Sequence, residues 1–196
     1  MAKTRTKTQI AKSNFKRKRM NVLLYVLLVF SPIACTKNEL GKMEICQTYM
    51  EKIKDLSSTE QSVVDAATVD IFNSGRDAIP YLIENASNNK KFFGGEIFNP
   101  QSSQIQQEVT VGVASLYIAE AIIRSDIHFA LNPLLLSKKH EQKDLSKNEP
   151  RNINIAIQAY KEWLVQYGKI PLKDIRTKML YPLSNSDVYW YGASGR

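Results

Sequence analysis

The 196-residue sequence is poor in the residues from which metal and catalytic sites are most often built. It has two cysteines and two histidines, and none of them stands at the spacing of a zinc site. No glycine-rich stretch carries the Lys and Ser or Thr of a phosphate-binding loop, and no serine sits in a nucleophile elbow. We therefore expect no metal and no cofactor, and we favour a non-enzymatic protein over an enzyme.

The scarcity of cysteine also limits covalent cross-linking. Cys46 falls on an apolar helical stripe, where a lone cysteine usually behaves as a small buried hydrophobe. If Cys35 is modified, Cys46 has no partner, and the core alone must stabilise the fold. A Cys35–Cys46 disulfide is the alternative if Cys35 stays a free thiol in an oxidising compartment.

Acidic residues are absent from the first 34 positions, which hold eight Lys or Arg residues. An apolar run over residues 22–30 follows these bases and leads to the small residue Ala34. A basic flank, an apolar run and a small-residue exit are typical of a secretory signal. The run is shorter than the roughly 20 apolar residues that span a bilayer. We interpret residues 1–34 as a signal peptide that is removed, with Met20 as an alternative start to Met1.

Cys35 directly follows this small residue. The arrangement resembles the lipobox of bacterial lipoproteins, in which the cysteine is lipidated and the peptide is cut just before it. The sequence departs from the usual motif at Pro32 and Ile33. The resemblance implies lipidation at Cys35, a lipidated tether over residues 35–39, and a membrane anchor through the N-terminal lipid. Because Thr36 stands where an Asp would retain the protein at the inner membrane, resemblance to enterobacterial sorting implies the periplasmic face of the outer membrane.

Positive charge is concentrated in the N-terminal segment. The whole chain has 27 Lys and Arg against 19 Asp and Glu. Eight of the bases and none of the acids lie in residues 1–34, so the remaining chain carries 19 of each and is close to neutral. Nucleic-acid binding usually requires a basic surface. We therefore exclude nucleic acid as a partner of the mature protein.

Apolar residues recur at spacings of three and four through most of the remaining chain, which indicates helices. The expected helices cover about 38–56, 57–75, 77–86, 110–124, 153–167 and 171–180. We therefore predict a single all-α domain over residues 40–196, either an irregular helical bundle or a short HEAT-like array. Two long loops, residues 87–108 and 125–151, interrupt the helices. Loops of this length are uncommon in compact domains and are often functional.

Residues 59–87 carry the resemblance to a HEAT-type helical repeat. Two amphipathic helices are joined there by a tight turn that contains Gly75 and Asp77, and Ile79, Pro80, Leu82 and Ile83 follow it. Ser57 and Glu60 stand in the relation of a capping box. Asp77 is expected to cap the second helix, with Pro80 in its first turn. One such unit cannot bury its own apolar face, so neighbouring helices must cover it.

The segment that begins at Thr110 is apolar on nearly every side, which predicts the central and most buried helix. Glu120 is the only acid in this segment. A carboxylate in such a helix must reach solvent or find a partner. We favour a solvent-side residue or a structural ion pair over a functional acid, because perturbed carboxylates also arise in structural networks.

Aromatic residues gather in the first loop and in the C-terminal tail. Those selected as partner-binding candidates are Phe92, Phe93, Phe98, Tyr189, Trp190 and Tyr191. The alternative for the loop aromatics, which we favour, is that they fold the loop back onto the core. For the tail, packing across the last helices and presentation to a partner are equally compatible with the pattern.

Three functions follow from these observations. The first is an envelope-anchored lipoprotein that acts as a non-enzymatic protein-binding module and holds another envelope or periplasmic protein. The second is an immunity-type lipoprotein that neutralises a periplasmic toxin. The third belongs to a different class: a hydrolase or cell-wall-modifying enzyme that uses an unrecognised acid such as Glu120.

The lipobox resemblance predicts a lipid-sized mass gain on Cys35. We expect the expressed protein to begin at Cys35, to carry this added mass, and to need detergent for solubility, because acyl chains partition into membranes. Intact-mass measurement and membrane partitioning test this, with Cys35→Ser as the matched variant that loses both properties. A soluble mature protein with a free Cys35 thiol would contradict lipidation and would reopen the Cys35–Cys46 disulfide.

Overall fold

A computed structural model describes residues 40–102 and 108–193, with side chains described from residue 47 onward. The chain divides into two units, residues 1–44 and 45–196. The first unit lies almost entirely outside the described residues, as do the predictions for the signal peptide, Cys35, the tether and the side chain of Cys46. The architecture given below is that of the second unit, together with the whole of the helix that begins at Leu40.

The described residues form a mostly helical fold, as the periodicity predicts. The elements are α2 (Leu40–Asp55), α3 (Gln61–Ser74), the 3-10 turn η1 (Gly75–Ala78), α4 (Ile79–Glu84), the 3-10 turn η2 (Asn85–Ser87), α5 (Val111–Arg124), β1 (Leu135–Ser137), α6 (Pro150–Tyr167), α7 (Leu172–Thr177) and β2 (Val188–Trp190). Strands β1 and β2 pair antiparallel, with Leu136 opposite Tyr189. The prediction of an all-α domain missed this small sheet, which joins the second long loop to the C-terminal tail.

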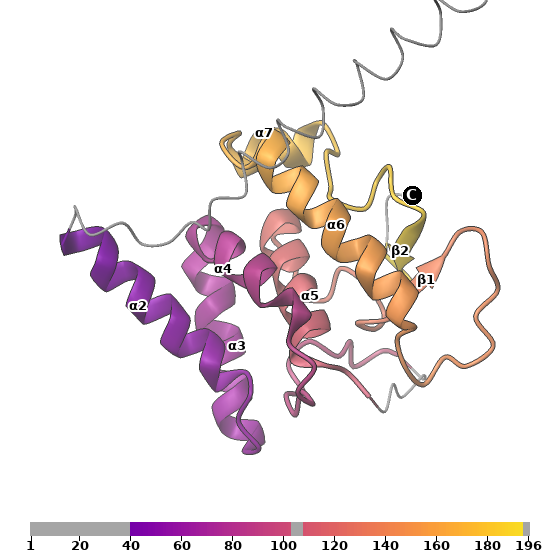
Figure 1. Cartoon of the computed structure of the whole chain (residues 1–196), viewed down its shortest axis with the longest axis horizontal. Coiled ribbons are helices and arrows are strands. Elements are labelled where there is room, and N and C mark those ends of the chain that lie inside the picture. The colour runs from indigo at the N-terminus through magenta and orange to yellow at the C-terminus, as the bar shows by residue number, and fades with distance from the viewer. Residues whose placement is uncertain (1–39, 103–107, 194–196) are drawn as a thin grey trace, which may run out of the picture. The chain divides into compact units, whose positions relative to one another are not determined.

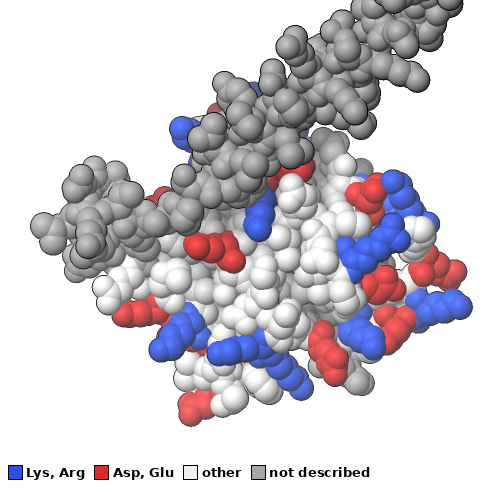
Figure 2. All heavy atoms as spheres, in the orientation of Figure 1, with Lys and Arg blue, Asp and Glu red and all other residues white. Residues whose placement is uncertain are grey.

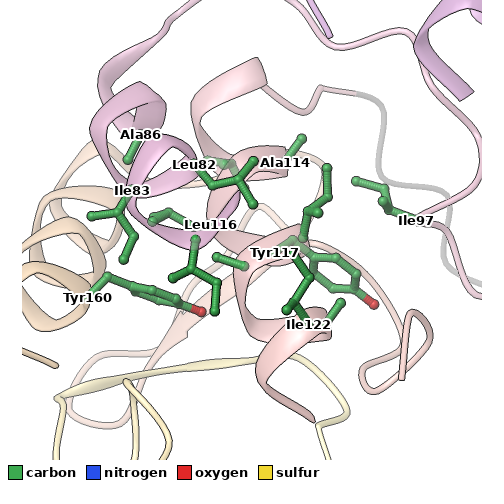
Figure 3. Packing of buried hydrophobic residues seen from close by; sticks show 14 of the residues in the cluster. Leu82, Ile83, Ala86, Ile97, Ala114, Leu116, Tyr117, Ile122 and Tyr160 are labelled. Carbon is green, nitrogen blue, oxygen red and sulfur yellow. The ribbon is translucent and has the colours of Figure 1, made fainter. Parts of the chain in front are cut away.

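Helix α5 occupies the centre of the core, as predicted. Every residue from Val111 to Ile123 is buried, and the helix contacts α3, α4, α6 and α7 (Figure 1). The Thr110 hydroxyl caps its first turn by accepting from the Val113 amide at 3.3 Å. Figure 3 shows Ile83 of α4, Leu116 of α5 and Tyr160 of α6 gathered in the same cluster. Burial of such side chains, each contributing about 1.5–3 kcal/mol, is the main stabilising term.

Local capping in the region of the HEAT-type resemblance differs from the prediction. Helix α3 begins at Gln61, and neither Ser57 nor Glu60 makes a side-chain cap. Instead the Ser58 hydroxyl accepts from the Glu60 amide at 3.1 Å. Asp77 lies inside η1 rather than at a helix start, because the turn after Gly75 winds directly into α4. Pro80 does lie in the first turn of α4, as expected.

The first long loop is fixed to the core along much of its described length. The Phe92 amide donates to the Val109 carbonyl at 2.8 Å, and the side chains of Phe92 and Ile97 are buried. The Asp65 carboxylate of α3 accepts from the amides of Gly95 at 2.6 Å and Glu96 at 3.2 Å. These bonds satisfy main-chain groups that a loop would otherwise leave unpaired.

Gly112 allows α5 to approach η2 very closely. A methyl group at this position would lie 2.2 Å from the Ala86 carbonyl oxygen, which belongs to the backbone and cannot rotate away. The Gly112 amide donates to the Asn88 carbonyl at 2.8 Å, and Asn85 Nδ2 donates to Ser115 Oγ at 3.0 Å. The contact between α5 and η2 therefore depends on the missing side chain.

We predict that Gly112→Ala destabilises the protein. Helix propensity alone favours Ala over Gly by about 1 kcal/mol, but forcing apart a packed contact costs typically 1–3 kcal/mol. We expect the free energy of unfolding to fall by up to about 2 kcal/mol, measured by urea denaturation followed by circular dichroism. Gln166→Ala, on the exposed side of α6, is the control and should change it by less than about 0.5 kcal/mol. A Gly112→Ala variant more stable than the wild type would show that α5 and η2 can move apart without loss of free energy of unfolding.

Candidate functional site

A chain of buried polar side chains links α5, α6 and β2. The Glu120 carboxylate on α5 is fully buried. One of its oxygens, Oε2, accepts from the Tyr160 hydroxyl of α6 at 2.7 Å. That hydroxyl in turn accepts from Trp190 Nε1 of β2 at 3.0 Å. Three elements that are distant in the sequence are therefore held together by one hydrogen-bonded chain.

Arg124 completes the surroundings of this carboxylate. Its Nε donates to Glu120 Oε1 at 2.8 Å, one helical turn along α5, and its side chain is only 13% exposed. The guanidinium carbon lies 3.8 Å from the ring centroid of Tyr181 and 5.1 Å from that of Phe129. Such cation–π contacts are attractive, especially where water is excluded. Of the two structural alternatives expected for Glu120, the ion pair is confirmed and the solvent-side position is wrong, because the side chain is fully buried.

Burial dominates the electrostatics of this group. It raises the pKa of Glu120 above its ordinary value, although the Arg124 charge and the hydrogen bonds from Tyr160 and Arg124 act in the opposite direction. Burial, followed by the neighbouring Glu120 charge, also raises the pKa of Tyr160 well above its ordinary value. Neither group has exposed surface. A catalytic acid must contact its substrate. The buried position of Glu120 therefore does not support the role that the hydrolase hypothesis gave it.

The C-terminal tail is both packed and accessible. Trp190 is buried, and its ring meets the Tyr117 ring edge-on, with centroids 5.3 Å apart. Tyr189 and Tyr191 are half-buried. The Tyr191 amide donates to the Leu134 carbonyl at 2.8 Å, which extends the pairing of β2 with β1. Packing therefore accounts for Trp190, and the two tyrosines remain candidates for contact with a partner.

The loop aromatics are divided in the same way. Phe92 is buried, which favours the predicted folding of the loop onto the core. Phe98 is half-buried and packs against the same core. Phe93 is 38% exposed, and Lys91 Nζ lies 5.4 Å from its ring centroid. Of these three side chains, Phe93 is the most accessible.

A surface groove of about 560 Å³ lies between α6 and residues 181–187, the segment that leads into β2. Its lining consists of Asn154, Ile155, Gln158, Ala159, Glu162, Trp163, Gln166, Tyr167, Tyr181, Pro182, Asn185, Ser186 and Asp187. Most of these residues are polar or aromatic, and no Lys, Arg or His is among them. A concave site with apolar floor and a few converging polar groups is the usual form of a binding site.

This groove was not predicted from the sequence. The spacing of apolar residues predicts a helix over 153–167, of which Ala156, Tyr160 and Trp163 are buried, but no role was assigned to the polar side of this helix. Recurrence of Asn, Gln or Glu every fourth residue on that side was a signal that could have been read. The opposite wall could not be found, because no local pattern places residues 181–187 beside α6.

The described part of the chain offers little for other kinds of site. Figure 2 shows acidic and basic side chains intermixed around a largely uncharged centre, so this face carries no patch of one sign. His128 Nδ1 is buried without a hydrogen-bond partner in the described structure, but no group of three or more His, Cys, Asp or Glu suited to a metal occurs among the described residues. Within the same residues, no helix is both long and apolar enough to cross a membrane.

Comparison of the chain with models of protein families, with curated proteins and with solved structures finds no match. The candidate site therefore depends on the geometry of this protein alone.

We predict that ionisation of Glu120 opposes folding. Because its folded pKa is raised above the unfolded value of about 4.3, the folded state binds more protons between those two values. Stability is then greatest at low pH and is lost as pH rises through the folded pKa. We expect the free energy of unfolding of the wild type, minus that of Glu120→Gln, to decrease as pH rises above about 4.3. Urea denaturation at a series of pH values measures this difference.

Taking the difference between the two proteins removes the other titrations. Asp144 and Asp187, whose pKa values are lowered chiefly by hydrogen bonds from Ser146 and Lys139 respectively, titrate in both. Tyr160→Phe, which keeps the carboxylate but removes one of its donors, should raise the folded pKa of Glu120 further, so the loss of stability should extend to higher pH and be larger in total. A difference that instead grows with pH would show that Arg124 and Tyr160 stabilise the carboxylate by more than its burial costs.

Proposed function

We propose that this protein is a lipid-anchored, non-enzymatic binding module of the bacterial cell envelope, tethered at Cys35 to the periplasmic face of the outer membrane. Its α6 groove holds another envelope or periplasmic protein. The groove itself is the observation that carries the proposal, because it is a concave surface that combines an apolar floor with exposed polar side chains. The signal-like leader and the lipobox resemblance support the location.

The wall of the groove formed by residues 181–187 is held by hydrogen bonds near both of its ends. Trp163 Nε1 of α6 donates to the Leu180 carbonyl at 2.6 Å, which holds the start of the opposite wall beside the helix. Asp187, at the far end of that wall, receives a hydrogen bond from Lys139 Nζ at 2.7 Å. A wall held at its two ends loses little conformational freedom when a partner binds, which favours affinity.

Arg76 fixes the C-terminal end of α6. Its guanidinium donates to the carbonyls of Gly168 and Ile170, which follow the last turn of the helix. Carbonyls at a helix end lack partners within the helix and carry partial negative charge, so a cation satisfies them. The helix that forms the longer side of the groove is therefore anchored to η1 as well as to α5 and β2.

For the scaffold we propose an irregular helical bundle rather than a HEAT-like array. Helix α4 has six residues, which is short for one of the two helices of a repeat. It continues into the 3-10 turn η2 instead of a regular connection to a further unit. The bundle is organised around α5, with elements of different lengths packed on it.

In-cell photo-crosslinking tests the proposed binding. A benzoyl-phenylalanine introduced in place of Gln166, whose side chain lines the groove, should give a discrete adduct with an envelope protein. The same probe in place of Val165, which is 68% exposed on the neighbouring position of α6 but does not line the groove, should not give this adduct. Identical adducts from both positions, or none from either, would contradict a partner in the groove.

A further inference from the structure

One side of the groove carries a regular row of polar side chains. The row consists of Asn154, Gln158, Glu162 and Gln166, each one helical turn from the next on α6. Because an α-helix rises about 1.5 Å per residue, successive members are about 6 Å apart. A parallel row, Ile155, Ala159, Trp163 and Tyr167, forms the floor. The groove therefore repeats a polar edge and an apolar floor at a fixed period.

Much of the hydrogen-bonding capacity of the polar row is not used by other described residues of the protein and faces solvent. The side chains of Asn154 and Gln166, and that of Asn185 on the opposite wall, make no hydrogen bond within the described residues. Gln158 Nε2 donates to Glu162 Oε1 at 2.8 Å, which leaves its own carbonyl oxygen open. Each side-chain amide offers both donor and acceptor groups, as a peptide main chain does.

The spacing of the row matches an extended polypeptide. In a strand, peptide groups that face the same way recur about every 6.6–6.8 Å, close to the 6 Å step along α6. The row from Asn154 to Gln166 is about 18 Å long, the length of five or six extended residues. A helical partner satisfies its own main-chain groups, so it would leave most of this capacity unused.

The charge of the groove favours a basic group in the ligand. Glu162 lies near the middle of the row, and no Lys, Arg or His lines the groove. The other lining carboxylate, Asp187, is already paired with Lys139 at 2.7 Å. Glu162 receives a hydrogen bond only from the neutral Gln158 amide among the described residues. A Lys or Arg side chain of the ligand would complement it.

We propose that the groove binds an extended segment of five or six residues of a partner protein, through its main chain, with a Lys or Arg side chain near the middle paired with Glu162. This inference rests on the proposed function and names the kind of ligand. The polar row selects the extended backbone, the apolar floor takes the side chains that point toward α6, and the Glu162 carboxylate sets the register.

Selection from displayed random eight-residue peptides, followed by fluorescence anisotropy with the synthetic peptides, tests this inference. The bait is the full chain in detergent. Selected peptides should share a Lys or Arg near the centre. Loss of one hydrogen bond costs about 0.5–1.5 kcal/mol, so Gln166→Ala and Asn154→Ala should each weaken binding by about two- to tenfold. Val165→Ala is the matched control and should leave affinity unchanged.

Two further comparisons distinguish recognition of the peptide main chain from nonspecific apolar binding. N-methylation of alternate residues in one phase of the peptide should weaken binding, whereas the opposite phase should be tolerated, because only one edge of an extended chain faces the row. Glu162→Lys should reverse the preference from basic to acidic central residues. Equal tolerance of both N-methylation phases, or an unchanged charge preference in Glu162→Lys, would overturn the inference.

The outcome also separates this inference from the proposed function. If no peptide binds but the crosslink from position 166 is still formed, the binding module stands and its ligand is a folded surface. If a soluble oligosaccharide binds and Gln166→Ala abolishes it, the groove is a glycan site and the extended-peptide inference fails. A wild-type dimer that Gln166→Ala dissociates would show that a second copy of this chain fills the groove. Loss of both crosslink and peptide binding would remove the two proposals together.

Discussion

The carboxylate of Glu120 is the constraint on which much of the structure depends. It lies in the middle of the most apolar helix, where an unpaired charge would be very costly. Arg124 and the Tyr160 hydroxyl bond to its two oxygens, and Trp190 bonds to that hydroxyl. Because Trp190 belongs to the C-terminal tail, the Tyr160 hydroxyl that donates to the carboxylate gains its own donor only when the tail has returned to the core. A local feature of one helix is thereby coupled to the last strand of the chain.

This return of the tail creates the groove. Once Trp190 is buried against Tyr117 and β2 is paired with β1, residues 181–187 must run alongside α6. The Trp163 indole holds the start of that segment and Lys139 holds its end. The groove that we propose as a binding surface is thus a consequence of how the C-terminal tail packs on the core rather than of a separate loop added to the scaffold.

Features of the structure that arise from residues close together in the sequence could be predicted, whereas features that arise from long-range contacts could not. Helix α5 and the burial of its faces come from periodicity within a few residues, and both were predicted. For Glu120 the pattern left a solvent-side position and an ion pair open, because periodicity does not say which partner a carboxylate finds. The capping by Ser57 and Asp77 was wrong, because the chain enters α3 and α4 through tighter turns than the motif assumes. The small sheet was missed because three-residue strands separated by two helices, α6 and α7, carry no recognisable alternation. The groove depends on that same long-range pairing, so only its α6 side had a local signal.

The buried network also extends into the wall of the groove. The Arg124 guanidinium that pairs with Glu120 covers the ring of Tyr181 at 3.8 Å, and Tyr181 lines the groove. The ion pair with Glu120 fixes the Arg124 guanidinium, so the Tyr181 ring that stacks on it has little freedom to change its position. An aromatic surface kept open in this way presents apolar area to a ligand without first paying the entropy of ordering it. The ion pair between Arg124 and Glu120, which allows a carboxylate inside the buried helix α5, therefore also fixes one side chain of the surface that we propose binds the partner.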